Sequence, residues 1–137
     1  MKVLIRKIKH SDYLGIIDLY NETHNKNIMY HDIDITDNKI IIVAETNNKI
    51  IGCLEINFLK NEIENYTYSY ITNLSIDKNH QNESLINLII QACIKISEQH
   101  KCTKIMLNIT NNHNFETFKD NDFKHLNNTV LLKDLVK

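Results

Sequence analysis

Three apolar, β-branched runs follow one another in the middle of the chain, with only short turns between them. They cover residues 39–44, 49–59 and 66–76, and Glu45-Thr46-Asn47-Asn48 joins the first two. Asparagine accepts the positive φ angles that a tight hairpin needs more readily than other residues with a side chain. The pattern therefore predicts an antiparallel meander of three strands.

Helical patterns lie on either side of this meander. Residues 84–100 carry an apolar stripe at helical spacing, which predicts a long amphipathic helix. Upstream, Lys2–Ile8 alternates like a strand, and Ser11-Asp12 opens a predicted helix. Between that helix and the meander, Asn21–Asp37 is polar, and we interpret it as a loop or short helix that could cover a site.

The last third of the chain adds three shorter elements. We predict a strand at 104–109, a short helix at 112–119 and a final strand at 123–132. The whole order is β-α-β-β-β-α-β-α-β. The chain is therefore expected to form one α/β (α+β) domain over residues 1–137.

Composition and charge exclude several classes of protein. The 137 residues have a net charge of −1 and are 42% hydrophobic, as expected for a soluble domain with one core. This balance gives no broad positive field, so we expect no nucleic-acid partner. The apolar runs are far shorter than the roughly 20 residues of a membrane crossing, so we expect no membrane partner. With no readable secretory signal, the expected location is cytoplasmic.

Cysteine and histidine spacing gives no sign of a disulfide framework or a metal site. Cys53, Cys93 and Cys102 are far apart and form no CxxC pair, so we expect three buried, unpaired thiols. The seven histidines are scattered singly, and we expect no metal.

Asparagine takes over the turn positions that other proteins give to glycine and proline. The chain has about 20 asparagines, two glycines and no proline. Because asparagine tolerates a left-handed backbone, missing glycines are weak evidence against a tight turn here.

The loop between the third meander strand and the long helix carries a resemblance. Residues 77–86 match the pattern (Gln/Arg)-x-x-Gly-x-(Gly/Ala) with Gln81 first, Ser84 second and Ile86 third. This loop and the element order resemble the GNAT superfamily of acyl-CoA N-acyltransferases. A loop that enters a helix presents unpaired backbone N–H groups to an anion such as a diphosphate.

Within this superfamily, the second half of the chain is most similar to the glucosamine-6-phosphate N-acetyltransferases. The stretches that carry the similarity are residues 70–76, 80–81, 102–108, 114–119 and 130–133. The resemblance implies a GNAT fold, which is a mixed, mostly antiparallel sheet flanked by helices. It also implies a V-shaped gap between the strands at 66–76 and 104–109.

The resemblance also assigns residues to acetyl-CoA, the expected co-substrate. The backbone of Leu74, Ser75 and Ile76 is expected to lie beside the pantetheine arm, and that of Leu74 to polarise the thioester carbonyl. The backbone of Gln81, Asn82, Glu83, Ser84, Leu85 and Ile86 is expected to bind the diphosphate. Asn114 and Phe118 are expected at the coenzyme, where Phe118 replaces a tyrosine of the family.

The remaining expected roles concern the acceptor, a small amine such as glucosamine 6-phosphate. Thr72, Asn73 and Asn108 are expected to contact it, and Lys133 to bind its phosphate. Asn73 and Tyr70 join Leu74 as candidates for catalysis. In the sugar-phosphate enzymes the C-terminal strand crosses into a second subunit, so the resemblance implies a homodimer.

Several alternatives stay open. Tyr66, Tyr68 and Tyr70 form either an aromatic ladder or a source of a catalytic phenol. His80 and His113 are either solvated loop residues or bases. Because Thr72, Asn73, Ser84, Ile86 and Phe118 depart from the family pattern, the chain could also be a GNAT-fold binding protein that has lost turnover. A third possibility is an N-acetyltransferase of another amine, such as a polyamine or a peptide terminus.

Overall fold

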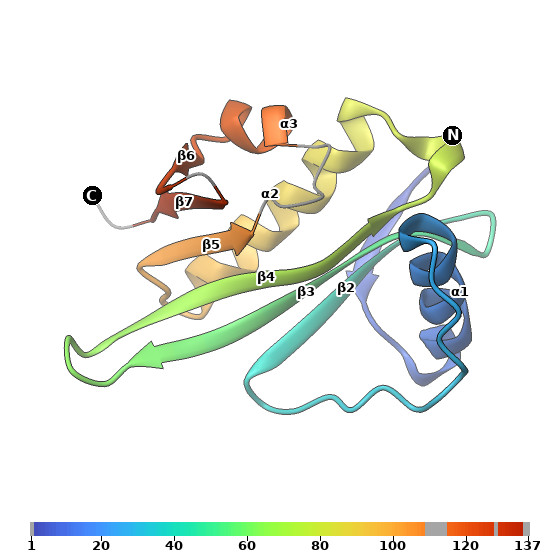
Figure 1. Ribbon diagram of the computed structural model, residues 1–137, viewed down its shortest axis with the longest axis horizontal. Coiled ribbons are helices and arrows are strands. Elements are labelled where there is room, and N and C mark those ends of the chain that lie inside the picture. The colour runs from blue at the N-terminus through green and yellow to red at the C-terminus, as the bar shows by residue number, and fades with distance from the viewer. Residues whose placement is uncertain (1, 109–114, 128, 136–137) are drawn as a thin grey trace.

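A mixed sheet forms the centre of the molecule. The computed structural model describes residues 2–108, 115–127 and 129–135. Within these residues the strands form a seven-stranded sheet in the order β1-β2-β3-β4-β5-β7-β6 (Figure 1). The strands are β1 (Leu4–Lys7), β2 (Lys39–Thr46), β3 (Lys49–Asn61), β4 (Tyr66–Ile76), β5 (Lys104–Asn108), β6 (Lys124–His125) and β7 (Val130–Asp134). Only β4 and β5 pair in parallel; the other described pairs are antiparallel.

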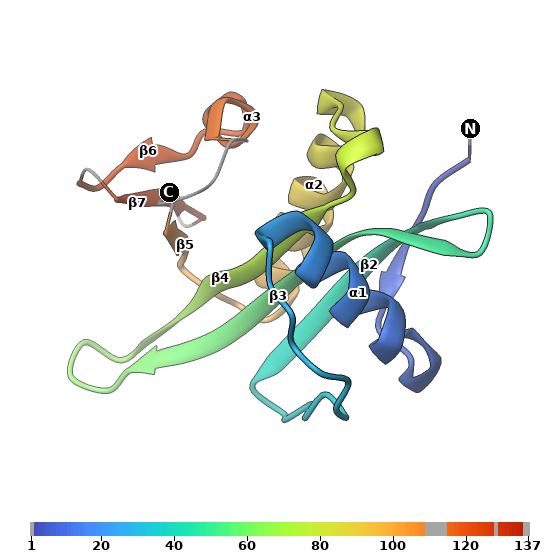
Figure 2. The same ribbon diagram turned by 45° about the vertical axis from the view of Figure 1, so that its right-hand side comes forward.

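Helices cover both faces of this sheet. They are α1 (Tyr13–His24), α2 (Glu83–Gln99) and α3 (Phe115–Asp120), and single 3-10 turns lie at η1 (His10–Asp12) and η2 (Lys78–His80). The helix α1 packs on one face, and α2 and α3 lie on the opposite one (Figures 1 and 2). We call these the α1 face and the α2 face. The predicted α/β sheet flanked by helices is confirmed.

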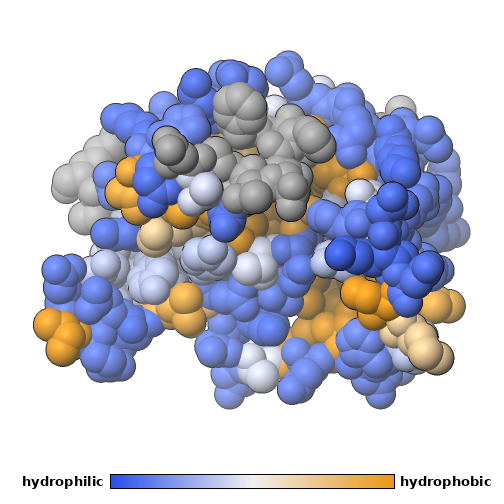
Figure 3. Space-filling view, in the orientation of Figure 1, coloured by the Kyte–Doolittle hydropathy of each residue, from blue (hydrophilic) through white to orange (hydrophobic). Residues whose placement is uncertain are grey.

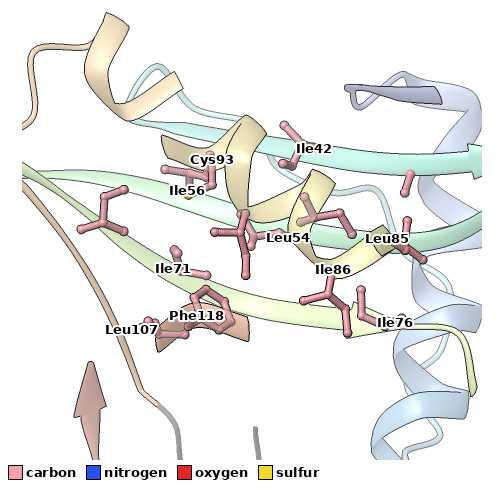
Figure 4. Packing of buried hydrophobic residues seen from close by; sticks show 14 of the residues in the cluster. Ile42, Leu54, Ile56, Ile71, Ile76, Leu85, Ile86, Cys93, Leu107 and Phe118 are labelled. Carbon is pink, nitrogen blue, oxygen red and sulfur yellow. The ribbon is translucent and has the colours of Figure 1, made fainter. Parts of the chain in front are cut away.

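The larger hydrophobic core lies on the α2 face. Figure 4 shows Leu85 and Ile86 of α2 pointing toward the strands, where Leu54, Ile71 and Ile76 meet them. At the start of α2 the Asn82 side chain accepts a hydrogen bond from the Leu85 N–H at 2.8 Å. This cap explains why the helix begins where the apolar stripe begins.

Asparagine occupies the left-handed turns, as predicted. Seven described residues other than glycine have a positive φ, and five of them are asparagines: Asn25, Asn47, Asn48, Asn65 and Asn73. The Asn47-Asn48 pair, with φ of 50° and 62°, closes the β2–β3 hairpin. The meander β2-β3-β4 is thereby confirmed.

The prediction of one final strand at 123–132 is wrong. The chain instead forms β6 and β7, which pair antiparallel with each other. Between them, the Asn127 Oδ1 accepts hydrogen bonds from the N–H groups of Thr129 and Val130 at 2.9 and 3.1 Å. This asparagine turn reverses the chain, which the apolar pattern alone does not reveal.

Two further features complete the fold. The three cysteines are buried and unpaired, as predicted. In the described part of the chain, no helix combines the length and the apolar content needed to cross a membrane.

Candidate active site

A β-bulge interrupts β4 near its end. Cys53 pairs with Ser75 and Glu55 with Thr72, so Asn73 and Leu74 together stand opposite Leu54. Asn73 has a φ of 53°, the left-handed conformation that such an inserted residue adopts here. The extra residue turns Leu74 toward the core of the α2 face and leaves Ser75 on the α1 face, across from Cys53.

The two halves of β4 differ in their pairing with β5. The parallel register runs from Ser69–Ile105 to Ile71–Leu107 and ends there within the described residues. Figure 2 shows β5 beside only the first part of β4. A cavity of about 1430 Å³ opens where the two strands part.

This cavity reaches both faces of the sheet. Its lining comes from the end of α1, the second half of β4, the start of α2, the end of β5 and α3. The residues are Tyr20, Thr23, His24, Asn25, Lys26, Tyr70, Ile71, Thr72, Asn73, Leu74, Ser75, Ile76, Lys78, Gln81, Asn82, Glu83, Ile86, Leu107, Asn108, Glu116 and Thr117. Two ligands that enter from opposite faces could therefore meet at the bulge.

Most of the residues expected at the site line this cavity. They are Tyr70, Thr72, Asn73, Leu74, Ser75, Ile76, Gln81, Asn82, Glu83, Ile86 and Asn108. Asn114 and His113 lie outside the described residues. Ser84, Leu85, Phe118 and Lys133 are described but do not line the cavity.

Packing explains why these four side chains lie elsewhere. Leu85 and Phe118 are 2% and 0% exposed and belong to the core. There the Phe118 and Phe123 rings meet edge-on, with their centroids 5.1 Å apart. Ser84 is exposed to solvent. The Lys133 Nζ lies 3.9 Å from Asp122 Oδ2.

The C-terminal strand completes the sheet of its own chain. Five residue pairs join β7 to β5, and Lys133 stands opposite Ile105. The expected crossing of this strand into a second subunit is therefore not needed to complete the sheet.

The entry to α2 offers a limited set of free backbone donors. The N–H groups of Asn82, Leu85 and Ile86 already donate to His80 O, Asn82 Oδ1 and Asn82 O. Among the described residues, no acceptor contacts the N–H groups of Gln81, Glu83 or Ser84. The Ile86 side chain packs in the core and is 4% exposed.

A charged side chain of each sign lies at this entry. Lys78 and Glu83 are both exposed and both line the cavity. The ammonium of Lys78 would attract a diphosphate, and the carboxylate of Glu83 would repel it. Because both are solvated, each contributes only weakly.

Polar side chains gather on the α1 face of the cavity. His24, the last residue of α1, has its Nε2 3.1 Å from the Ser75 Oγ. Nearby, the Thr72 hydroxyl donates to Glu55 Oε1 at 2.7 Å and accepts from Asn57 Nδ2 at 2.9 Å. Sequence reasoning missed His24 because 51 positions separate it from Ser75.

His80, Tyr66 and Tyr68, also considered from the sequence, do not line the cavity. His80 Nδ1 is 2.5 Å from the buried Asp77 Oδ2. The ring centroids of Tyr66 and Tyr68 lie 5.9 Å apart, and the Lys104 ammonium lies 4.6 Å from the Tyr66 ring centroid. Of the three tyrosines, only Tyr70 reaches the cavity.

Metal ligands and reactive thiols were also considered at the site. Across the described residues, no three histidine, cysteine, aspartate or glutamate side chains gather in a way that could hold a metal ion. Cys53 stands opposite Ser75 on the neighbouring strand, and burial raises the pKa of its thiol to about 12. The thiol therefore stays protonated near neutral pH.

Comparison with known proteins agrees with this architecture. The acetyltransferase (GNAT) family matches residues 5–119. No curated protein matches the sequence. A probable acetyltransferase from Staphylococcus epidermidis superposes with a TM-score of 0.80 at 15% identity, over 98% of this chain and 100% of that one.

Two further solved structures share the fold. Glucosamine-6-phosphate N-acetyltransferase from Arabidopsis thaliana gives a TM-score of 0.77 at 16% identity, over 93% of this chain and 95% of that one. A Clostridium acetobutylicum protein described as a predicted acetyltransferase, solved with acetyl-CoA, gives a TM-score of 0.73 at 16% identity, over 93% of both chains. With its element order, split sheet and family match, the chain belongs to the GNAT family of acetyltransferases.

Proposed function

We propose that this protein is an acetyl-CoA-dependent N-acetyltransferase whose two substrates meet at the bulge of β4. The observation that carries the proposal is the cavity, which reaches both faces of the sheet at this point. Acetyl transfer from a thioester to an amine needs a positioned amine and donors for the developing oxyanion. It needs no nucleophilic side chain of the enzyme.

The coenzyme enters from the α2 face. Its diphosphate binds to the free N–H groups of Gln81, Glu83 and Ser84, at the positive end of the α2 dipole. Lys78 offsets the charge of Glu83. This set is smaller than the sequence predicts, because the Asn82 cap, the first helical turn and the turn back to His80 O each already use one donor.

The acetyl group lies against the second half of β4. Residues 73–76 have no described partner on the β5 side, so this edge can face the pantetheine arm. The backbone N–H of Leu74, displaced by the bulge, polarises the thioester carbonyl. Asn73, Ser75 and Ile76 flank this point.

The amine acceptor enters from the α1 face, and glucosamine 6-phosphate is our first candidate. Tyr70, Thr72 and Asn108 contribute polar groups to this part of the cavity. For the phosphate, Lys26 lines the cavity, whereas Lys133 pairs with Asp122 outside it. We therefore assign the phosphate contact to Lys26 in place of Lys133.

Calorimetry with acetyl-CoA tests the coenzyme site. Binding at or below millimolar coenzyme supports the proposal, and no heat of binding at that concentration would overturn it. Binding without thiol release on addition of glucosamine 6-phosphate, spermidine or a peptide with a free amino terminus would favour a binding protein that has lost turnover.

A thiol-release assay with paired substrates tests the acceptor. We expect a lower KM for glucosamine 6-phosphate than for glucosamine, and we expect Lys26→Ala to remove the difference. Lys133→Ala serves as the matched control and should leave the difference between the two KM values intact. The reverse result would restore the phosphate contact to Lys133, and equal KM values would exclude phosphate recognition.

The biological setting completes the proposal. We place the reaction in the cytoplasm, carried out by one domain, and we retain the homodimer that the resemblance implies. Light scattering coupled to size exclusion tests the homodimer, and a mass of 16.1 kDa in solution would exclude it.

A further inference from the structure

We infer that His24 accepts the proton that the amine releases, and that the Ser75 hydroxyl relays this proton to it. This inference rests on the proposed function and adds the proton route to it. His24 Nε2 and Ser75 Oγ lie 3.1 Å apart, and both residues line the cavity. Ser75 directly follows the bulge residues Asn73 and Leu74, which places it next to the backbone that faces the thioester.

Local structure holds the imidazole in place. His24 is the last residue of α1, and Asn25 ends the helix in the left-handed conformation with its N–H bonded to Asn21 O. The His24 ring contacts the Tyr20 ring with centroids 4.5 Å apart. The ring is therefore held by its neighbour on α1 and lies next to the Ser75 hydroxyl.

The charged groups around the cavity are poor alternatives as the base. Lys26 and Lys78 are cationic at neutral pH and have no free lone pair. Glu83 and Glu116 are carboxylates at the cavity wall, and both are exposed. An exposed carboxylate is a weak base near neutral pH, whereas an imidazole titrates in this range.

The neutral groups near Ser75 are no better. Tyr20 and Tyr70 are phenols, which act as acids rather than bases at neutral pH. The raised pKa of the Cys53 thiol keeps it protonated. His80 is paired with Asp77 and does not line the cavity. Among the described residues that line the cavity, His24 is therefore the base best placed for the reaction.

The transfer step balances with these groups. The amine nitrogen forms a bond to the acetyl carbon, and the C–S bond breaks with its electron pair on sulfur. The amine proton passes to the Ser75 oxygen while the Ser75 proton passes to His24 Nε2. The coenzyme leaves as a thiolate, which takes up the proton from His24 or from water.

The first test replaces the imidazole with an uncharged side chain. His24→Gln should lower kcat by about 10²–10⁴-fold, the usual contribution of a general base. It should leave the calorimetric Kd for acetyl-CoA unchanged. The wild-type pH profile of kcat/KM should have an acid limb, and this limb should be absent from the variant. His31→Gln is the matched control, because His31 is exposed and lies outside the cavity.

The second test separates a proton route from a merely structural role. His24→Ala should regain activity when free imidazole is added, in proportion to the imidazole base present. Ser75→Ala should also lower kcat, without a change in the Kd for acetyl-CoA. If the wild type turns over and His24→Gln keeps both its kcat and its acid limb, this inference is wrong and the proposed function stands. If the wild type binds no acetyl-CoA, both are wrong.

Discussion

The two faces of the sheet differ in what fills them. The α2 face carries one continuous apolar core, which includes Leu54, Ile89 and Phe118, each at most 1% exposed. The α1 face has a smaller apolar patch around Ile16, Leu19 and Val43.

Polar groups occupy much of the rest of the α1 face. Arg6 pairs with Asp12 and Glu45, Thr72 bonds Glu55 and Asn57, and His24 contacts Ser75. In Figure 3 much of the visible surface is hydrophilic, with an apolar spot at the tip of the β3–β4 hairpin, where Ile63 is 94% exposed. The α2 face therefore supplies most of the apolar packing of the sheet, whereas the α1 face holds more of its polar pairs.

Replacing a leucine by alanine should therefore lower the free energy of unfolding more on the α2 face than on the α1 face. Leu54→Ala on the α2 face should lower the free energy of unfolding by about 2–5 kcal/mol, because it opens a cavity in the closed core. Leu19→Ala on the α1 face should fall at the low end of this range, because its cluster is small. Urea denaturation followed by circular dichroism measures both. Equal losses would mean that the two faces contribute alike to stability.

Replacing a glycine by alanine should lower the free energy of unfolding on the α2 face and raise it on the α1 face. In Gly52→Ala the new Cβ would lie 2.9 Å from Ile89 Cδ1 and 3.3 Å from Ile76 Cδ1, so we expect a loss of about 1–3 kcal/mol. In Gly15→Ala it would lie 3.3 Å from Ile50 Cγ1, and the better helix propensity should add up to about 1 kcal/mol. Thermal melts of both variants check this. A gain for Gly52→Ala would show spare room in the core.

The ion pair of the α1 face should make stability depend on pH. The hydrogen bond from Arg6 holds the pKa of Asp12 below its usual value. This stabilisation is complete above the unfolded pKa of about 3.9 and is lost as the pH falls through the lower folded value. Asp12→Asn should cost about 1–3 kcal/mol at pH 7, and the difference from wild type should shrink below about pH 4.

Asp18, an exposed aspartate of α1, is the control for this measurement. Asp18→Asn should change the free energy of unfolding by less than about 0.5 kcal/mol at any pH. Urea titrations at several pH values compare the two variants. A pH-independent cost for Asp12→Asn would assign its effect to packing.

Local patterns were enough to predict most of the fold. The expected strand at 66–76 is β4, and the expected helix at 84–100 matches α2 within one residue at each end. The spacing of apolar residues follows which side chains are buried, so strands and helices with one buried face can be predicted from the sequence. The split of the last strand depends on hydrogen bonds of the Asn127 side chain, which leave no periodic signal.

The candidate site was predictable only along the segment that carries the resemblance. The residues of β4 and Gln81, Asn82 and Glu83 line the cavity as expected. Phe118 was expected at the coenzyme, but its side chain turns into the core. His24 ends α1 and Lys26 follows two residues later, and both reach the cavity only through the packing of α1 on the sheet. Such proximity between distant segments is absent from any local pattern.

The asparagines at left-handed positions have a consequence for the denatured ensemble. A glycine at Asn25, Asn65 or Asn73 would relieve backbone strain in the native turn, but it would also give the unfolded chain more conformations to lose on folding. The two effects oppose each other. With asparagine in place of glycine, the unfolded chain samples a narrower set of backbone conformations at these turns. The sequence has no proline, so no proline restricts the unfolded chain further.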